Sequence, residues 1–78
     1  MSDKEDLYDD AIDAYADDKF DEAIELTKKY IAQEPEDILA HTNLSMFYQK
    51  KGMVPEAEAA GAEARRLDWK RQLKEGKK

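Results

Sequence analysis

Hydrophobic and polar residues are interleaved along the whole chain, and good helix formers dominate both classes. Ala, Leu, Glu and Lys are frequent, β-branched residues are few, and Gly and Pro stand at only a handful of positions. A chain of this kind has a high summed helix propensity and little that favours strands. The pattern therefore predicts an all-α fold.

Breakers and capping residues divide the first half of the chain into two predicted helices. The first spans about residues 4–16, and Ser2 or Asp3 can serve as its N-cap. The second spans about residues 21–33, after a tight turn of sequence DDK, and Pro35 ends this pair. Because the connection is short, the two helices must lie antiparallel.

The second half of the chain contains the same signals. Asp37 is a good N-cap for a third helix that runs to about Lys50, and Gly52 suits the left-handed position after a helix. Pro55 stands where a fourth helix begins. Trp69 leaves two alternatives for its end: the helix runs on to about Glu75, or the chain bends near residue 68 into a short cap.

The chain also matches itself when it is shifted by about 34 residues. This interval contains two predicted helices, and we call it the repeat offset. The matching pairs are Leu7 with His41, Ala11 with Ser45, Phe20 with Val54, Glu22 with Glu56, Ala23 with Ala57, and Pro35 with Trp69. In the second copy, Leu-Ser at 44–45, Tyr48, Gly52 and the small residues Ala57 and Ala64 follow a recognisable order. Both the interval and this order resemble the tetratricopeptide repeat family, whose pattern is W-x2-L-G-x2-Y, then A-x3-F, then P.

The resemblance implies two antiparallel helical hairpins stacked as a short right-handed α-α superhelix in a single domain. Repeat 1 would span about residues 4–37 and repeat 2 about 38–68, followed by a C-terminal helical extension and basic tail at 69–78. The structural positions of the repeats would be Ala11, Phe20, Ala23, Pro35, Leu44, Ser45, Tyr48, Gly52, Ala57 and Ala64. Small residues among them let helix backbones approach, while large ones fill the space where the helices diverge.

The apolar residues that we expect inside follow from this arrangement. They are Leu7, Ala11, Ala14, Phe20, Ala23, Ile24, Tyr30, Ile31, Leu44, Phe47, Tyr48, Val54, Ala57, Ala64 and Leu67.

Acidic side chains give the chain a net charge of -6 and an uneven charge distribution. Residues 1–37 hold 14 acidic and 4 basic side chains, whereas residues 38–78 hold 5 and 9. The negative balance argues against nucleic acid as a partner, because phosphates need a basic surface. Asp9, Asp10 and Asp13 have the D-D-x-x-D spacing of some magnesium sites. On a helix, however, Asp9, Asp13 and Asp17 form a solvated row outside the core, and Asp10 lies to one side of it. We therefore expect no metal and no cofactor.

Catalytic constellations cannot be assembled from this sequence. Cysteine is absent and His41 is the only histidine, which we expect to be half-packed at the start of the third helix. The N-terminus has no apolar signal-peptide core and no stretch approaches 18 apolar residues, so we expect neither a membrane span nor a membrane partner. The sequence predicts a non-enzymatic protein in the cytoplasm.

The resemblance also indicates which surface would recognise a partner. Tetratricopeptide proteins usually bind an extended peptide or a partner helix on the concave face made by the first helix of each repeat. The corresponding residues are Tyr8, Ile12, Tyr15, Leu39, Thr42, Asn43, Met46, Gln49 and Lys50. We expect this face to bind a protein or peptide; the alternative is a self-associating scaffold unit, in which the chain forms a homo-oligomer by head-to-tail or dimeric stacking.

Overall fold

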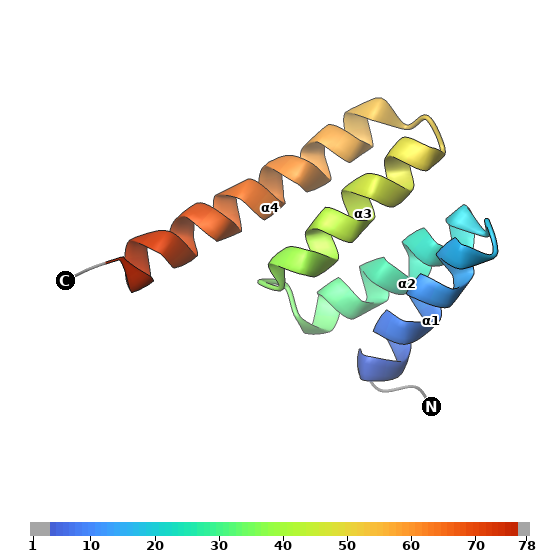
Figure 1. The fold of residues 1–78 in the computed structure, drawn as a ribbon, viewed down its shortest axis with the longest axis horizontal. Helices are drawn as coiled ribbons and strands as arrows, with labels where there is room; N and C mark the ends of the chain where they lie inside the picture. The colour runs from blue at the N-terminus through green and yellow to red at the C-terminus, as the bar shows by residue number, and fades with distance from the viewer. Residues whose placement is uncertain (1–3, 77–78) are drawn as a thin grey trace.

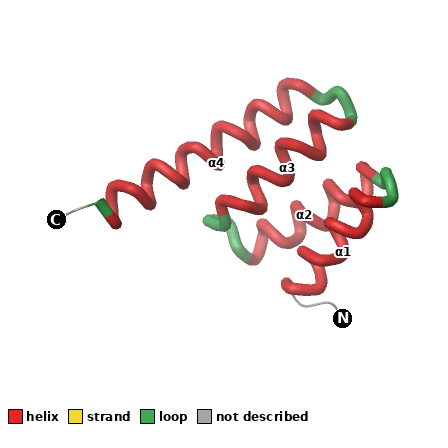
Figure 2. The backbone as a smooth tube through the Cα atoms, in the orientation of Figure 1, coloured by secondary structure: helices red, strands yellow, loops and turns green. Residues whose placement is uncertain are grey.

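The computed structural model describes residues 4–76, which form four α-helices joined by short turns (Figure 1). The helices are α1 (Lys4–Ala16), α2 (Phe20–Gln33), α3 (Ile38–Lys50) and α4 (Val54–Glu75). Only loops separate them, and no residue in this described range lies in a strand (Figure 2). The predicted all-α fold is confirmed, and the predicted bounds agree to within one residue apart from the open end of α4. The two proposed N-caps of α1 lie outside the described residues.

The helices pack as two antiparallel hairpins laid side by side (Figure 1). One hairpin is formed by α1 and α2, the other by α3 and α4, and α3 packs against α2 to join them. The Cα atoms extend only 17 Å in the shortest direction against 44 Å in the longest. The molecule is therefore a thin layer of helices, and a large part of each helix faces solvent.

The turns of the two hairpins have the same backbone geometry at positions related by the repeat offset. Asp18 and Gly52 both have positive φ angles, of 61° and 76°. In each turn the next residue, Lys19 or Met53, donates its backbone N–H to the carbonyl five positions earlier, at 2.8 Å and 2.9 Å. The predicted left-handed conformation of Gly52 is confirmed, and the two turns match each other in backbone geometry.

The hydrophobic core runs between the hairpins and is built largely from alanines around one aromatic ring. Phe47 is the largest fully buried side chain, and the ring of Tyr15 stacks on it with centroids 5.0 Å apart. Of the expected core, ten residues are buried: Leu7, Ala11, Ala14, Ala23, Ile24, Leu44, Phe47, Ala57, Ala64 and Leu67. The rings of Phe20, Tyr30 and Tyr48 and the side chain of Ile31 are half-buried instead. Within residues 4–76, four further residues are buried, namely Thr27, Ala40, His41 and Ala60.

The predicted burial of Val54 is wrong, because its side chain is 56% exposed. Its counterpart in the first hairpin, Phe20, packs on the ring of Tyr15 with centroids 5.8 Å apart. The position equivalent to Tyr15 in the second hairpin is the exposed Gln49. Val54 is short and has no aromatic ring to meet, so it remains in solvent.

Small residues bring α3 and α4 together, as the sequence predicts. The hydroxyl of Ser45 donates to the backbone carbonyl of Ala57 at 2.7 Å. A methyl group placed on Gly61 would lie 3.3 Å from the Ser45 hydroxyl oxygen, which is a tight contact. Close backbone approach replaces large side chains at this interface, so little apolar area is buried there.

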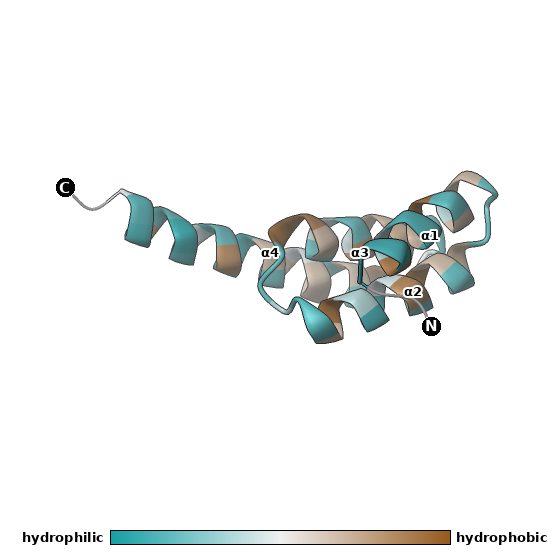
Figure 3. Cartoon of the chain, turned by 90° about the horizontal axis from the view of Figure 1, so that it is seen from below, coloured by the Kyte–Doolittle hydropathy of each residue, from teal (hydrophilic) through white to brown (hydrophobic). Residues whose placement is uncertain are grey.

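The fourth helix continues past Trp69 without a break, so the alternative of a bend into a separate cap is wrong. Its last turns project beyond the other helices (Figures 1 and 3). Trp69 is 62% exposed and Leu73 is 55% exposed, and neither covers the core. Lys70 forms an ion pair with Glu36 of the α2–α3 connection at 3.0 Å, which holds the start of this projection.

None of the helices described between residues 4 and 76 is both long enough and apolar enough to cross a bilayer.

Candidate partner-binding face

The start of α3 is fixed by the carboxylate of Asp37, which accepts two hydrogen bonds. One oxygen caps the helix by accepting from the backbone N–H of Ala40 at 3.1 Å, as the sequence predicts. The other accepts from the hydroxyl of Tyr30 at 2.6 Å. This hydrogen bond, with smaller contributions from burial and from the negative charge of Asp37, raises the pKa of Tyr30 to about 12. The phenol is therefore held in one orientation beside the α3 N-terminus.

Tyr8 connects three helices at the same place. Its ring meets the ring of Tyr30 edge to face, with centroids 5.2 Å apart and planes at 67°. Its hydroxyl oxygen accepts a hydrogen bond from the side-chain amide of Asn43 at 3.1 Å. Edge-to-face pairs are a favoured aromatic geometry, so the two rings form a stable apolar platform.

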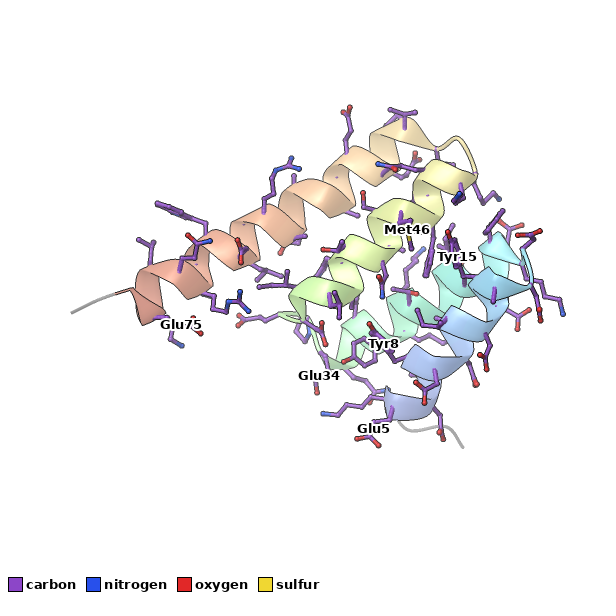
Figure 4. The ribbon with its side chains drawn as sticks, in the orientation of Figure 1. Glu5, Tyr8, Tyr15, Glu34, Met46 and Glu75 are labelled. Atoms are coloured by element: carbon purple, nitrogen blue, oxygen red, sulfur yellow. The ribbon has the colours of Figure 1, made fainter. Side chains whose placement is uncertain are left out.

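A shallow, open groove of about 530 Å³ lies over this platform. We call it the tyrosine groove; its lining residues are Glu5, Tyr8, Asp9, Tyr30, Asp37 and Leu39. Figure 4 shows Glu5 and Tyr8 on the part of α1 that lies near the α2–α3 connection. Glu5 and Asp9 are exposed and form no ion pair with any other described residue. The groove thus combines an aromatic floor with an acidic rim that is open to a cation.

A second hollow, of about 340 Å³, lies between α3 and α4. It is lined by Thr42, Ser45, Met46, Gln49, Gly61, Ala64 and Arg65. Met46, labelled in Figure 4, is half-buried and packs against the core at this place. Ser45, Gly61 and Ala64 give this hollow small lining residues, and among the described residues that line it Arg65 alone is charged. Its chemistry therefore differs from that of the tyrosine groove.

Five of the nine residues predicted for the partner face line one of these two hollows. Tyr8 and Leu39 line the tyrosine groove, Thr42, Met46 and Gln49 line the hollow between α3 and α4, and Asn43 is joined to Tyr8. Ile12 is exposed on α1, and Lys50 is exposed at the far end of α3. Tyr15 is shared with the core, because its ring stacks on Phe47. The structure thus brings α1 and α3 together on one side of the molecule, but it does not gather all nine side chains around one hollow.

Sequence reasoning missed four residues that line the tyrosine groove: Glu5, Asp9, Tyr30 and Asp37. Tyr30 was expected in the core and Asp37 only as a cap. Their spacing across Pro35 is a usable signal, since a tyrosine near the end of one helix can reach the cap of the next. Asp9 is exposed, as expected for the acidic row, but it also stands at the edge of a hollow.

The remaining candidate residues from the sequence are the acidic residues of α1 and His41. Asp9, Asp10 and Asp13 are exposed, and no group of three or more potential metal ligands occurs within residues 4–76. The imidazole of His41 is buried, more deeply than expected, and its Nε2–H donates to the backbone carbonyl of Pro35 at 2.9 Å. This hydrogen bond ties the α2–α3 connection to α3.

Comparison of the chain with protein-family models, with curated proteins and with solved structures finds no match.

Proposed function

We propose that this chain is a non-enzymatic protein-binding module whose α1 and α3 side binds a segment of another polypeptide. The segment would carry an apolar side chain that packs on the tyrosine platform, next to basic side chains that pair with the acidic rim. The observation that supports this most is the tyrosine groove itself. Two tyrosine rings lie at its floor, and the carboxylates of Glu5 and Asp9 stand beside them without a described cationic partner.

The energetics of the groove favour a partner of this chemistry. Leu39 is 60% exposed at its edge, so apolar area remains available for burial. Hydrogen bonds to Asp37 and Asn43 hold both tyrosines, so little side-chain entropy is lost when a partner docks. Carboxylates at the rim speed the approach of a basic partner and select against an acidic one.

We also propose that the two hairpins are repeats of the tetratricopeptide type, arranged as a short right-handed superhelix. The turn geometry shared across the repeat offset supports this, as do equivalent buried alanines at Ala23 and Ala57. In this interpretation α1 and α3 are the first helices of their repeats, which is the side on which the tyrosine groove lies. A role without catalysis is supported by the structural hydrogen bond of His41.

The proposal is tested with two synthetic 12-residue peptides that each contain two leucines four positions apart. One carries four lysines and the other carries four glutamates at the same positions. Binding is measured by fluorescence anisotropy of the labelled peptides at low salt. We expect the basic peptide to bind with a dissociation constant on the order of 0.1 mM, as for a small interface, and the acidic peptide to bind at least about tenfold more weakly.

Two exposed apolar residues near helix starts provide a matched pair of variants. Leu39→Lys removes apolar area from the groove and places a like charge in front of the basic peptide, so we expect at least about tenfold weaker binding. Val54→Lys makes an equivalent change at a residue that is 56% exposed and lies outside the groove, and should leave the affinity unchanged. Equal effects of the two substitutions, a preference for the acidic peptide, or no binding at millimolar concentration would each contradict the proposal.

A further inference from the structure

The projecting end of α4 carries an apolar stripe that no other residue between 4 and 76 covers. Trp69 and Leu73 are four residues apart, so they lie one above the other on the same side of the helix. Both are more than half exposed, and together with Gln72 and Gly76 they border a shallow hollow at the end of the helix. Large apolar side chains paired in this way are typical of a docking surface.

Basic side chains form a second stripe next to this apolar one. Lys70 and Lys74 are also four residues apart, and each directly follows one of the two apolar residues. On α1, the rim of the tyrosine groove presents Glu5 and Asp9, again four residues apart. A separation of four residues corresponds to about 6 Å along a helix, so the two lysines and the two carboxylates have the same spacing. The end of α4 therefore matches the groove in both charge and apolar character.

A chain cannot place this stripe in its own groove. α4 is one unbroken helix from Val54 to Glu75, and its last turns lead away from α1 (Figure 1). Figure 4 shows Glu75 well separated from Tyr8 and Glu5, on the other side of the α2–α3 connection. The end of α4 from a second copy has no such restriction.

Simple stacking of whole hairpins is a poorer way to join two copies. On α3, Ala40, Leu44 and Phe47 are all buried, and Phe47 contacts Tyr15 of the first hairpin. At the equivalent positions of the first repeat, α1 has Asp6, Asp10 and Asp13, all exposed. Burying these carboxylates against another copy would remove three charges from water, which is costly.

The outer side of α4 presents the same obstacle. Ile24 and Ile31 of α2 lie in or against the core, but their equivalents on α4 are the exposed Glu58 and Arg65. Both outer faces of the two-hairpin layer are therefore charged where a stacked neighbour would need apolar residues.

We propose that the end of α4, through Trp69, Leu73, Lys70 and Lys74, binds the tyrosine groove of a second copy of this chain. This inference rests on the proposed binding function of the groove and assigns it a ligand. Lys70 would exchange its ion pair with Glu36 for one with the groove rim. Both partners in that pair are largely exposed, so little stability is lost by the exchange. The interface is small, so association occurs at about 0.1 mM chain or above.

The test uses two full-length variants that each lack one half of the contact. The tail variant, Trp69→Ala with Leu73→Ala, keeps the groove; the groove variant, Glu5→Lys with Asp9→Lys, keeps the tail. Sedimentation velocity at low salt, between about 10 µM and 1 mM chain, should show self-association of the unsubstituted protein and none of either variant alone. An equimolar mixture of the two variants should associate again, because one intact tail meets one intact groove.

A third variant separates the groove from net charge. Glu22→Lys with Glu25→Lys makes the same charge change on exposed residues of α2 outside the groove, and should self-associate like the unsubstituted protein. Circular dichroism melting checks that each variant is folded. Trp69 is the only tryptophan and is exposed, so its emission should shift to shorter wavelength as the concentration of the unsubstituted chain rises. The association should weaken at about 0.5 M salt, where charges are screened within a few ångströms.

Several results would overturn the inference. These are a monomer at every concentration, association of the tail variant on its own, or a mixture of variants that does not associate. The tail variant also separates the two proposals. If it binds the basic 12-residue peptide but the mixture stays monomeric, the groove binds other polypeptides and only the inference about α4 fails. If it binds neither peptide nor partner variant, the proposed function fails as well.

Discussion

Replacing Phe47 with alanine should remove a central aromatic contact between the two hairpins. Phe47 is fully buried, and Tyr15 of the first hairpin stacks on its ring at 5.0 Å. Phe→Ala substitutions in well-packed cores cost about 3–5 kcal/mol, through lost burial and the cavity that remains. The thin helical layer can relax only partly, because alanines such as Ala14 and Ala23 already pack close to the core. We therefore expect about 3–4 kcal/mol of destabilisation.

This loss is a large part of the total stability expected for a domain of this size, at about 0.05–0.15 kcal/mol per residue. The melting temperature should fall by at least about 12 °C, at about 4–8 °C per kcal/mol. Urea unfolding followed by circular dichroism at 222 nm measures the change; the emission of the exposed Trp69 is a poor reporter of the core. Val54→Ala, at an exposed site, should change stability by less than about 0.5 kcal/mol. A loss below about 1 kcal/mol for Phe47→Ala would refute the account of how the hairpins are joined.

Five further substitutions, at four positions, test local features. Asp37→Ala removes the cap of α3 and the acceptor of Tyr30, and should cost about 2–3 kcal/mol in urea unfolding. Asp37→Asn should lose less than half of that, since an asparagine also caps; equal losses would show that the cap is not responsible. For Tyr30→Phe, the stability difference from the unsubstituted protein should be constant below pH 10. It should shrink between pH 10 and 12, because the pKa of Tyr30 is raised to about 12 in the fold and the unfolded chain loses that proton first. A difference that grows over this range would contradict the hydrogen bond to Asp37. Gly52→Ala should cost about 1 kcal/mol because φ is 76°, whereas Asp18→Gly, at a φ of 61°, should be neutral or stabilising in thermal melts; the reverse order would be inconsistent with the turn geometry.

Much of the fold could be predicted because its signals are local. Asp37 caps α3, Gly52 has a positive φ and Pro55 stands at the start of α4, each for reasons that involve only neighbouring residues. The repeat offset then identifies equivalent positions in the two hairpins from the sequence alone. The exposure of Val54 could not be predicted in this way, because it depends on a contact with the preceding helix. Phe20 meets the ring of Tyr15 there, whereas Val54 has only Gln49 at the equivalent position.

The candidate site was harder to predict from the sequence, because it depends on contacts between different helices. The edge-to-face pair of Tyr8 and Tyr30 joins α1 to α2, and no periodicity of the sequence places the two rings together. Whether α4 continued or bent at Trp69 was equally open, because both forms are compatible with its helix-forming residues. In the structure α4 is one continuous helix, and the ion pair of Lys70 with Glu36 is formed in this extended form.

The central claim is that both hairpins together form one binding surface around the tyrosine groove. The most direct measurement is a nitrogen-15 chemical-shift map of the full chain during titration with the basic 12-residue peptide. We predict saturable shifts on α1 at Glu5, Tyr8 and Asp9 and on α3 at Leu39 and Asn43, all with one dissociation constant. Shifts confined to one hairpin, or centred on Val54 and the outer face of α4, would contradict the claim.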